Sequence, residues 1–325
     1  MATSQAHSTL PKSVLDGVYR TIDPILAVRA NGKGVCSSKT RTERRQFYLQ
    51  MVAQLWELGF RIRKLDSLAG KHVAALMNHW HQQGVSVGTL HTRRSMMNHL
   101  CTSLGKLNVV KDITDYLPED EVRRRTVCKE SKAWEENEVD PLEVIDLART
   151  IDERLAVILA MQHFFGLRVK ESIELRPANA LVEGGTMLEL HEGTKGGLPR
   201  RVPIKTDDQM DVVNWARRVA SAGNTKRLRW TDCTWKQAQN RFYHLIRYRL
   251  GITRKLKGIT AHGLRHGYGQ ARYLVLTGWK APAAGGPSTQ QLTPAQHSQD
   301  QVARQTISRE LGHERQQITT VYLGR

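Results

Sequence analysis

The sequence lacks the features of a secreted, membrane-embedded or metal-stabilised protein. Its four cysteines, Cys36, Cys101, Cys128 and Cys233, lie far apart with no CxxC pair, so neither a zinc module nor a disulfide framework is predicted. No apolar run approaches the roughly 18 residues of a membrane span, and the polar start MATSQAHSTLPKS has no signal-peptide core. We therefore expect a cytoplasmic protein with reduced thiols, no metal, no cofactor and no membrane partner.

Acidic residues are few relative to basic ones. Lys and Arg number 49 against 31 Asp and Glu, which leaves a net charge of +18 and a sequence pI of about 10.0. Such an excess favours a polyanionic partner, nucleic acid first and anionic membrane a distant second. The chain of 325 residues, 40% of them hydrophobic, is long enough for two domains that each have a core.

The first half of the chain has the pattern of a small helical domain. Residues 1–38 form an extension with one possible short helix at 13–27, and three amphipathic helical patterns follow between residues 39 and 117. Residues 118–132 alternate acid and base, as an exposed linker would. Basic residues that could contact phosphates stand at helix beginnings or opposite the apolar stripes, although for any one of them a solvated surface is the simpler interpretation: Lys39, Arg41, Arg44, Arg45, Arg93 and Arg94.

Residues 133–325 have the pattern of a second, larger domain. Helical patterns are interrupted by TMLELHE and RRVPI, two extended runs joined by GTKGGLP, which predict an antiparallel hairpin. Residues 279–300 are rich in Pro, Gly, Gln and Ser and predict a loop. The fold class predicted for the whole chain is mainly α with a small antiparallel β-sheet.

Four short stretches of this domain carry chemically useful side chains. They are GLRVKESIEL, GTKGGLPRRVPI, AHGLRHGYGQ and LGHERQQITTVY, and each alone is a weak signal. In one unbroken helix His313 and Tyr322, nine residues apart, would point to opposite faces. Gly312 is a natural helix stop and Thr319 or Thr320 can begin a new short helix, so we expect a break that turns both side chains inward.

Together the four stretches supply what breaking a phosphodiester without a metal requires. Arg168 and Arg265 can hold the two non-bridging oxygens by bidentate hydrogen bonds as charge develops. A phenol, whose ordinary pKa is about 10, can attack if a base and a positive field help it to ionise, which suits Tyr322. Lys195 at the hairpin tip can protonate the leaving oxygen. His262 is our first choice as base, and His313 as phosphate ligand.

Taken together, GLRVKE, TKGGLPRRVP, HGLRHGY and LGH followed nine residues later by Tyr resemble the motifs of the tyrosine recombinases, the phage integrase family. The resemblance covers about residues 133–325, and more loosely 39–117 as a core-binding domain. It implies a clamp around double-stranded DNA, a 3′-phosphotyrosine intermediate, strand exchange through a four-way junction in a homo-tetramer, a bacterial or phage origin and possible accessory DNA-bending proteins. It also implies a catalytic set, with Glu171 supporting Arg168: Arg168, Lys195, His262, Arg265, His313 and Tyr322.

Several alternatives stay open at this stage. His266 competes with His262, and Tyr268 and Tyr273 compete with Tyr322, while Arg200 and Arg201 beside the hairpin tip are further candidates for DNA contacts. The 48 residues from Arg265 to His313 are more than is usual in the family, so we interpret residues 279–300 as an insertion that could supply a subunit contact. A DNA-binding protein with this fold and little turnover, and a topoisomerase-like relaxing enzyme, are the alternative functions.

Overall fold

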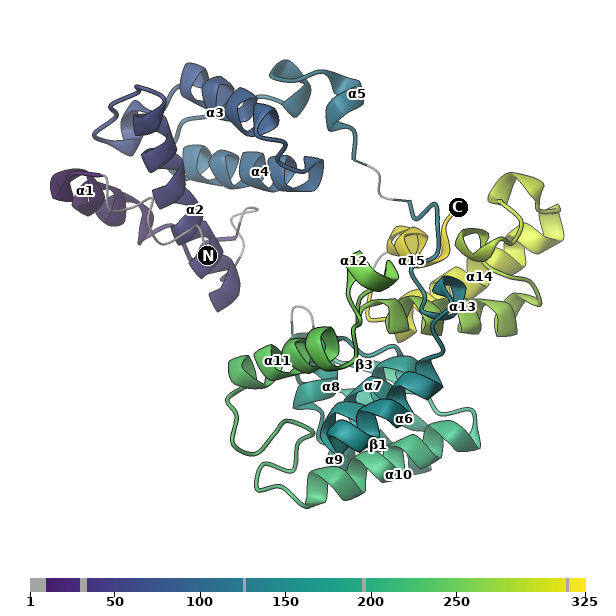
Figure 1. Cartoon of the computed structure of the whole chain (residues 1–325). Helices are drawn as coiled ribbons and strands as arrows, with labels where there is room; N and C mark the ends of the chain where they lie inside the picture. Colours follow the sequence, from purple (N-terminus) through teal and green to yellow (C-terminus); the bar gives the residue numbers. More distant parts are fainter. Residues whose placement is uncertain (1–9, 30–33, 125–126, 195–196, 314–315) are drawn as a thin grey trace. The chain divides into compact units, whose positions relative to one another are not determined.

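The computed structural model describes residues 10–29, 34–124, 127–194, 197–313 and 316–325. The chain forms two compact units, Met1–Arg125 and Thr126–Arg325, which Figure 1 shows in purple to blue and in teal to yellow. The division falls inside the predicted linker. Among the described residues, no helix combines the length and the apolar character that crossing a membrane requires.

The first unit is built from helices around one core. Its elements are α1 (Lys12–Ile22), α2 (Ser38–Glu57), α3 (Gly70–Gln82), α4 (Val87–Ser103), α5 (Glu119–Val122) and the 3₁₀ turns η2 (Leu65–Ser67) and η3 (Ile113–Asp115). Ser37 caps α2 by accepting the Thr40 N–H. Helix α1 contributes Val14, Val18 and Ile22 to the same core as α2, α3 and α4. The helix predicted in the N-terminal extension therefore belongs to this unit.

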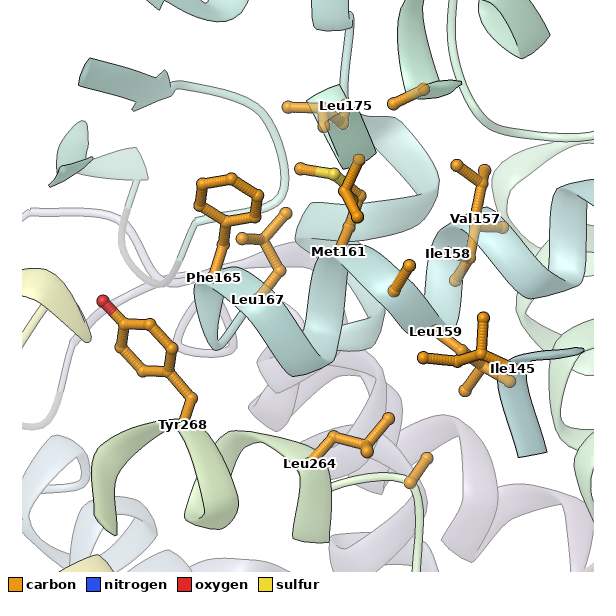
Figure 2. Close-up of a cluster of buried hydrophobic side chains, with 14 of the residues drawn as sticks. Ile145, Val157, Ile158, Leu159, Met161, Phe165, Leu167, Leu175, Leu264 and Tyr268 are labelled. Atoms are coloured by element: carbon orange, nitrogen blue, oxygen red, sulfur yellow. The ribbon is translucent and has the colours of Figure 1, made fainter. Parts of the chain in front are cut away.

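The second unit surrounds the helix α7 (Glu153–Phe165). Nine of its residues are buried, on every side of the helix, as expected of a helix without a polar face. Helices α6 (Pro141–Ile151), α10 (Asp207–Ser221) and α13 (Gly263–Thr277) pack around it. Figure 2 shows Met161 on the side of α7 where Leu175 lies, and Leu264 and Tyr268 of α13 across the helix, all within this core. Because α7 ends at the first arginine motif, its burial fixes where that motif lies.

A three-stranded antiparallel sheet follows, in the order β1 (Leu181–Val182), β2 (Met187–Leu190) and β3 (Arg200–Pro203). Leu188 pairs with Val202, and both side chains are fully buried. The predicted hairpin is confirmed, whereas β1 is too short for a periodic signal. Lys195 at the hairpin tip lies outside the described residues.

The remaining helices lead to the carboxyl end. They are α8 (Val169–Glu174), α9 (Pro177–Ala180), α11 (Trp235–His244), a π-helical turn η7 (Leu245–Arg249), α12 (Arg254–Lys257), α14 (Pro294–Glu310) and α15 (Thr320–Leu323), with 3₁₀ turns η4 (Glu135–Asn137), η5 (Glu183–Gly185), η8 (Pro282–Ala284), η9 (Thr289–Gln291) and η10 (Gln316–Thr319). Figure 1 shows α15 beside α13 and α14.

The prediction of a loop through residue 300 is wrong for residues 294–300, which begin helix α14. Thr293 and Gln296 form a capping box, with Thr293 N–H donating to Gln296 Oε1 at 2.9 Å, and Pro294 occupies the first turn. These are ordinary signals of a helix start. The abundance of Gln, Ser and Pro in this stretch concealed them.

We expect Leu159→Ala to destabilise the second unit by about 2–5 kcal/mol, because Leu159 on α7 is fully buried and its truncation leaves a cavity. Denaturant unfolding followed by a fluorescence probe in the second unit measures the change. Leu147→Ala on α6 is the matched control, since Leu147 is 51% exposed and should cost far less. Equal losses in the two variants would contradict the assignment of α7 as the centre of this core.

Candidate active site

The turn after α7 fixes Arg168. Gly166 ends the helix with φ of +59°, and a Cβ there would lie 2.7 Å from the ring of Tyr268, so the position requires glycine. Arg168 is the N-cap residue of α8, and Glu171 accepts both its backbone N–H at 2.7 Å and its Nη1 at 2.5 Å. The first catalytic candidate is therefore held at both its main chain and its side chain by the predicted supporting residue.

Glu171 is the anionic centre of the site. Its side chain is fully buried and pairs with Arg168, with Arg200 at 2.7 Å and with Arg265 at 3.8 Å. Burial opposes ionisation, but the charges of Arg200, Arg168 and Arg265 together outweigh it and lower the pKa of Glu171 to about 2. One carboxylate from α8 thus gathers guanidinium groups from three parts of the chain.

Arg168 and Arg265 converge on one backbone oxygen. Arg168 Nη2 donates to the carbonyl oxygen of Leu311 at 3.2 Å, and Arg265 Nη2 donates to the same oxygen. Arg265 is 1% exposed and also donates from Nη1 to the Gly166 carbonyl oxygen at 2.5 Å. Burial and the charges of Arg200 and Arg168 lower the pKa of Arg265 to about 10, which leaves it cationic at neutral pH. Two cations therefore face a single acceptor position.

The carboxyl end brings His313 and Tyr322 together, as the sequence predicts. Helix α14 ends at Glu310, Gly312 has φ of +65°, and His313 N–H donates back to the Ser308 carbonyl oxygen at 2.8 Å, the pattern of a glycine-terminated helix. Helix α15 then carries Tyr322, which is 4% exposed. His313 Nε2 lies 3.2 Å from the Tyr322 phenolic oxygen, and Arg265 Nε donates to that oxygen at 3.3 Å.

His262, the N-cap residue of α13, and His266 within this helix both lie near Tyr322. His262 borders an open cavity of about 580 Å³ beside Arg168, and its ring centre lies 6.0 Å from that of Tyr322. His266 is buried, and its ring centre lies 4.8 Å from that of Tyr322. Desolvation and nearby cations lower the pKa of His262 to about 4, and desolvation and His262 lower that of His266 to about 3. His313, rather than His262, therefore lies within hydrogen-bond distance of the phenol.

The competing tyrosines are engaged elsewhere. Tyr268 donates to Glu310 Oε2 at 2.7 Å and Tyr273 donates to Asp300 Oδ1 at 2.5 Å. Desolvation and Asp300 raise the pKa of Tyr273 to about 12, and desolvation and Glu310 raise the pKa of Tyr268 well above its ordinary value. A phenol that donates to a carboxylate is hard to ionise, so both rivals are poor nucleophiles.

Lys195 lies outside the described residues, but Gly193, which precedes it in the chain, is described. Gly193 has φ of +78°, and a Cβ there would lie 2.8 Å from the backbone carbonyl of Lys170. The hairpin connection thus packs on α8 two residues before Lys195, close to Arg168 and Glu171. The role of Lys195 stays a prediction.

Two of the predicted phosphate contacts do not fit the structure. Arg44 is buried and donates to the carbonyl oxygens of Leu26 and Val28, and Arg200 is buried on Glu171. Their guanidinium groups are turned to oxygens of the protein itself. The other candidates have exposed or partly exposed side chains: Lys39, Arg41, Arg45, Arg93, Arg94 and Arg201. Most of them form surface ion pairs. The Arg93 guanidinium lies over the Trp80 ring, 4.6 Å from its centre.

A basic segment that sequence reasoning missed borders the site. Residues 241–257 hold six Lys or Arg and no Asp or Glu, and this absence of acids was the available signal. Arg247 and Arg254 line the same cavity as Arg168 and His262. Arg247 lies over the Tyr243 ring at 5.1 Å, and Tyr248 is 75% exposed on a π-helical turn, a rare geometry that is frequent at functional sites.

Nothing in the described part of the chain resembles a metal centre, since no three His, Cys, Asp or Glu side chains are grouped as ligands. Guanidinium groups of Arg168, Arg200 and Arg265 carry positive charge at the site.

We expect Glu171→Gln to lower the free energy of unfolding by about 3–5 kcal/mol, because three arginines lose their buried counter-charge. The folded-state pKa of Glu171 is depressed from its ordinary 4.5 to about 2. Its contribution is therefore complete above pH 4.5 and disappears as the pH falls towards 2.

Urea titrations of both proteins at pH 7 and at decreasing pH measure this difference. Glu183→Gln is the matched control, since its exposed pair with Arg201 contributes little. A difference between wild type and Glu171→Gln that stays constant down to pH 2 would show that the carboxylate charge is not the cause.

Comparison with known proteins gives a consistent result. Residues 25–110 match the family described as phage integrase, N-terminal, and residues 124–271 match the family described as integrase. No curated protein sequence matches.

Solved structures share the fold across nearly the whole chain. Lambda integrase, residues 75-356, as a dimer bound to a COC′ core site, is 15% identical with a TM-score of 0.58, covering 96% of this chain and 94% of that one. The Tn1549 transposon integrase with transposon right end DNA is 11% identical with a TM-score of 0.56, covering 96% and 95%. XerH site-specific recombinase in a post-cleavage complex with difH is 15% identical with a TM-score of 0.54, covering 100% and 88%.

The two family matches fall one in each unit. The solved structures share the fold in which the two arginines and the phenol converge. The chain belongs to the phage integrase family, the tyrosine recombinases.

Proposed function

We propose that this protein is a site-specific DNA recombinase that cuts and rejoins DNA through a 3′-phosphotyrosine intermediate, without metal or ATP. One observation carries the proposal. The Tyr322 phenolic oxygen accepts a hydrogen bond from Arg265 and lies 3.2 Å from His313 Nε2. Arg265 and Arg168 both donate hydrogen bonds to the Leu311 carbonyl oxygen. A nucleophile, a proton acceptor and two oxyanion-binding cations are thus within one constellation.

Double-stranded DNA is the substrate that the charges favour. The net charge of +18 and the basic segment 241–257 beside Arg168 suit a polyphosphate backbone. The solved neighbours include integrases bound to core-site and transposon-end DNA and a lambda integrase tetramer bound to a Holliday junction. We propose that this chain also acts as a homo-tetramer on DNA, in the cytoplasm. DNA-bending proteins are possible accessory partners.

The first step forms one phosphodiester and breaks another. Arg168 and Arg265 transfer hydrogen bonds from the Leu311 carbonyl oxygen to the non-bridging oxygens of the scissile phosphate, and His262 at the cavity edge contacts the same phosphate. The Tyr322 oxygen attacks phosphorus as its proton passes to His313. The bond from phosphorus to the 5′ oxygen breaks, and that oxygen takes a proton from Lys195.

Rejoining is the reverse of this step with another 5′-hydroxyl as nucleophile. The number of phosphodiester bonds does not change in either direction, so no high-energy cofactor is needed. This assignment exchanges the two histidine roles expected from the sequence, because His313 is the histidine placed at the phenol.

We expect Tyr322→Phe to bind its DNA site within about twofold of wild-type affinity and to form no covalent adduct, because only the attacking oxygen is lost. A duplex nicked next to the cleavage point traps the adduct, and gel shift measures binding. Tyr268→Phe is the matched control and should keep the adduct. If wild type forms no adduct on its own site, the chain binds DNA on this fold without turnover.

We expect Lys195→Ala to slow cleavage of ordinary DNA by about 10²- to 10⁴-fold, the usual contribution of a general acid. A substrate with sulfur as the 5′ leaving atom should restore the rate, since a thiolate leaves without protonation. Single-turnover cleavage of both substrates is the measurement. Arg168→Ala should not be rescued by sulfur, and a Lys195→Ala variant that is not rescued either would remove Lys195 from the role of acid.

A further inference from the structure

The first residues of the second unit lie against the helix that carries Tyr322. Cys128 N–H donates to the Thr320 carbonyl oxygen at 3.0 Å, and a Cβ on Gly324 would lie 3.0 Å from the Cys128 carbonyl oxygen. We call residues 127–134 the entry segment, since the chain passes through them from the first unit into the second. Its main chain is thus in contact with both ends of α15.

A side-chain path runs from the entry segment to the Tyr322 backbone. Ser131 Oγ donates to Gln270 Oε1 at 2.9 Å, and Gln270 Nε2 donates to the Tyr322 carbonyl oxygen at 2.9 Å. Ser131 Oγ in turn accepts the Ala133 N–H at 3.1 Å. Gln270 is buried on α13, and its two partners, one donor and one acceptor, determine the orientation of its amide.

Helix α15 depends on contacts of this kind. It has four residues, and an isolated helix of one turn is not stable in water. Arg304 on α14 supplies a further anchor, because its Nη1 donates to the Gly324 carbonyl oxygen at 2.9 Å. Tyr322 is therefore placed by its neighbours rather than by the helix it belongs to.

The entry segment also adjoins the other catalytic candidates. A Cβ on Gly263 would lie 2.4 Å from the Lys132 carbonyl oxygen, so the segment packs on the first turn of α13, where His262 and Arg265 are. The Lys132 charge is one of the causes that lower the pKa of His262 and of His266. The alternative that Ser131 and Gln270 only stabilise the fold predicts no specific effect on Tyr322.

We propose that Ser131 and Gln270 are positioning residues, which hold α15 so that the Tyr322 phenol faces Arg265 and His313 and which tie the nucleophile to the entry segment. The inference rests on the proposed function, in which Tyr322 attacks the DNA. Because the entry segment is the covalent connection to the first unit, a displacement of this segment is passed to Tyr322 through two hydrogen bonds. Attack is then coupled to the connection between the units.

The test compares full-length variants on DNA. Gln270→Met keeps the length of the side chain but removes both hydrogen bonds, and Ser131→Ala removes the hydroxyl. The matched control is Gln299→Met, because Gln299 Nε2 donates to the carbonyl oxygens of Leu276 and Thr277 at 3.0 and 3.2 Å, at the other end of α13. Each variant is assayed for DNA affinity and for single-turnover adduct formation on the nicked duplex.

We expect Gln270→Met to slow adduct formation on the order of 10- to 100-fold, the effect of a misplaced reacting atom, with DNA affinity changed less than about twofold. Ser131→Ala should slow it less, and the double variant should be no slower than Gln270→Met, because both act on one path. Sulfur as the leaving atom should not rescue these variants. Gln299→Met should cleave at the wild-type rate even if its melting temperature falls as much as that of Gln270→Met.

Hydrogen exchange of the carboxyl-terminal peptide gives a readout that does not depend on activity. Gln270→Met and Ser131→Ala should speed exchange in residues 316–325, whereas Gln299→Met should not. If Gln270→Met cleaves DNA and exchanges hydrogen at the wild-type rates, the inference is overturned and the proposed function is left intact. Absence of an adduct with wild type would instead overturn the proposed function, and exchange would still decide whether the path holds α15.

Discussion

The ion cluster around the Glu171 carboxylate is the constraint on which the site depends. A fully buried carboxylate without a partner would be very costly, and here Arg168, Arg200 and Arg265 compensate it. Those arginines come from the turn after α7, from β3 and from α13, so the cluster joins three elements that have no sequence proximity. Since like charges repel, the three guanidinium groups can stand together only because Glu171 stands between them.

The three arginines of this cluster differ in the hydrogen bonds that their guanidinium groups donate. Arg200 is enclosed and serves the protein, whereas Arg168 and Arg265 keep donors directed at the Leu311 carbonyl oxygen. We propose that an oxygen of the scissile phosphate takes the position of that carbonyl oxygen. The phenol of Tyr322 lies at the edge of the same group through Arg265. Burial alone does not separate these arginines, since Arg265 is as buried as Arg200; they differ in the oxygens to which their guanidinium groups donate.

Sequence reasoning recovered the parts of the site that local signals encode. Gly312 predicted the break that lets His313 and Tyr322 meet, and the extended runs predicted the β2–β3 hairpin. It did not recover partnerships made across the chain. Arg200 is enclosed by Glu171 and by the Glu310 carbonyl oxygen, 29 and 110 residues away, and no local pattern reports such burial.

Other differences have equally specific causes. The start of α14 was encoded in Thr293 and Gln296 but was hidden by loop-like composition. Which of His262 and His313 lies within hydrogen-bond distance of the phenol depends on differences of a few ångströms, and spacing along a chain does not determine them. Gln270 carries no charge and belongs to no motif, so only its two hydrogen bonds show that it connects Ser131 to Tyr322.

The measurement that tests the central claim most directly is identification of the residue that carries the DNA. Wild-type protein is allowed to react with a nicked duplex, nuclease reduces the DNA to a few nucleotides, and mass spectrometry of the peptides locates the attached phosphate. The account predicts a nucleotide adduct on Tyr322. An adduct on Tyr268, Tyr273 or a serine, with Tyr322 unmodified, would contradict it.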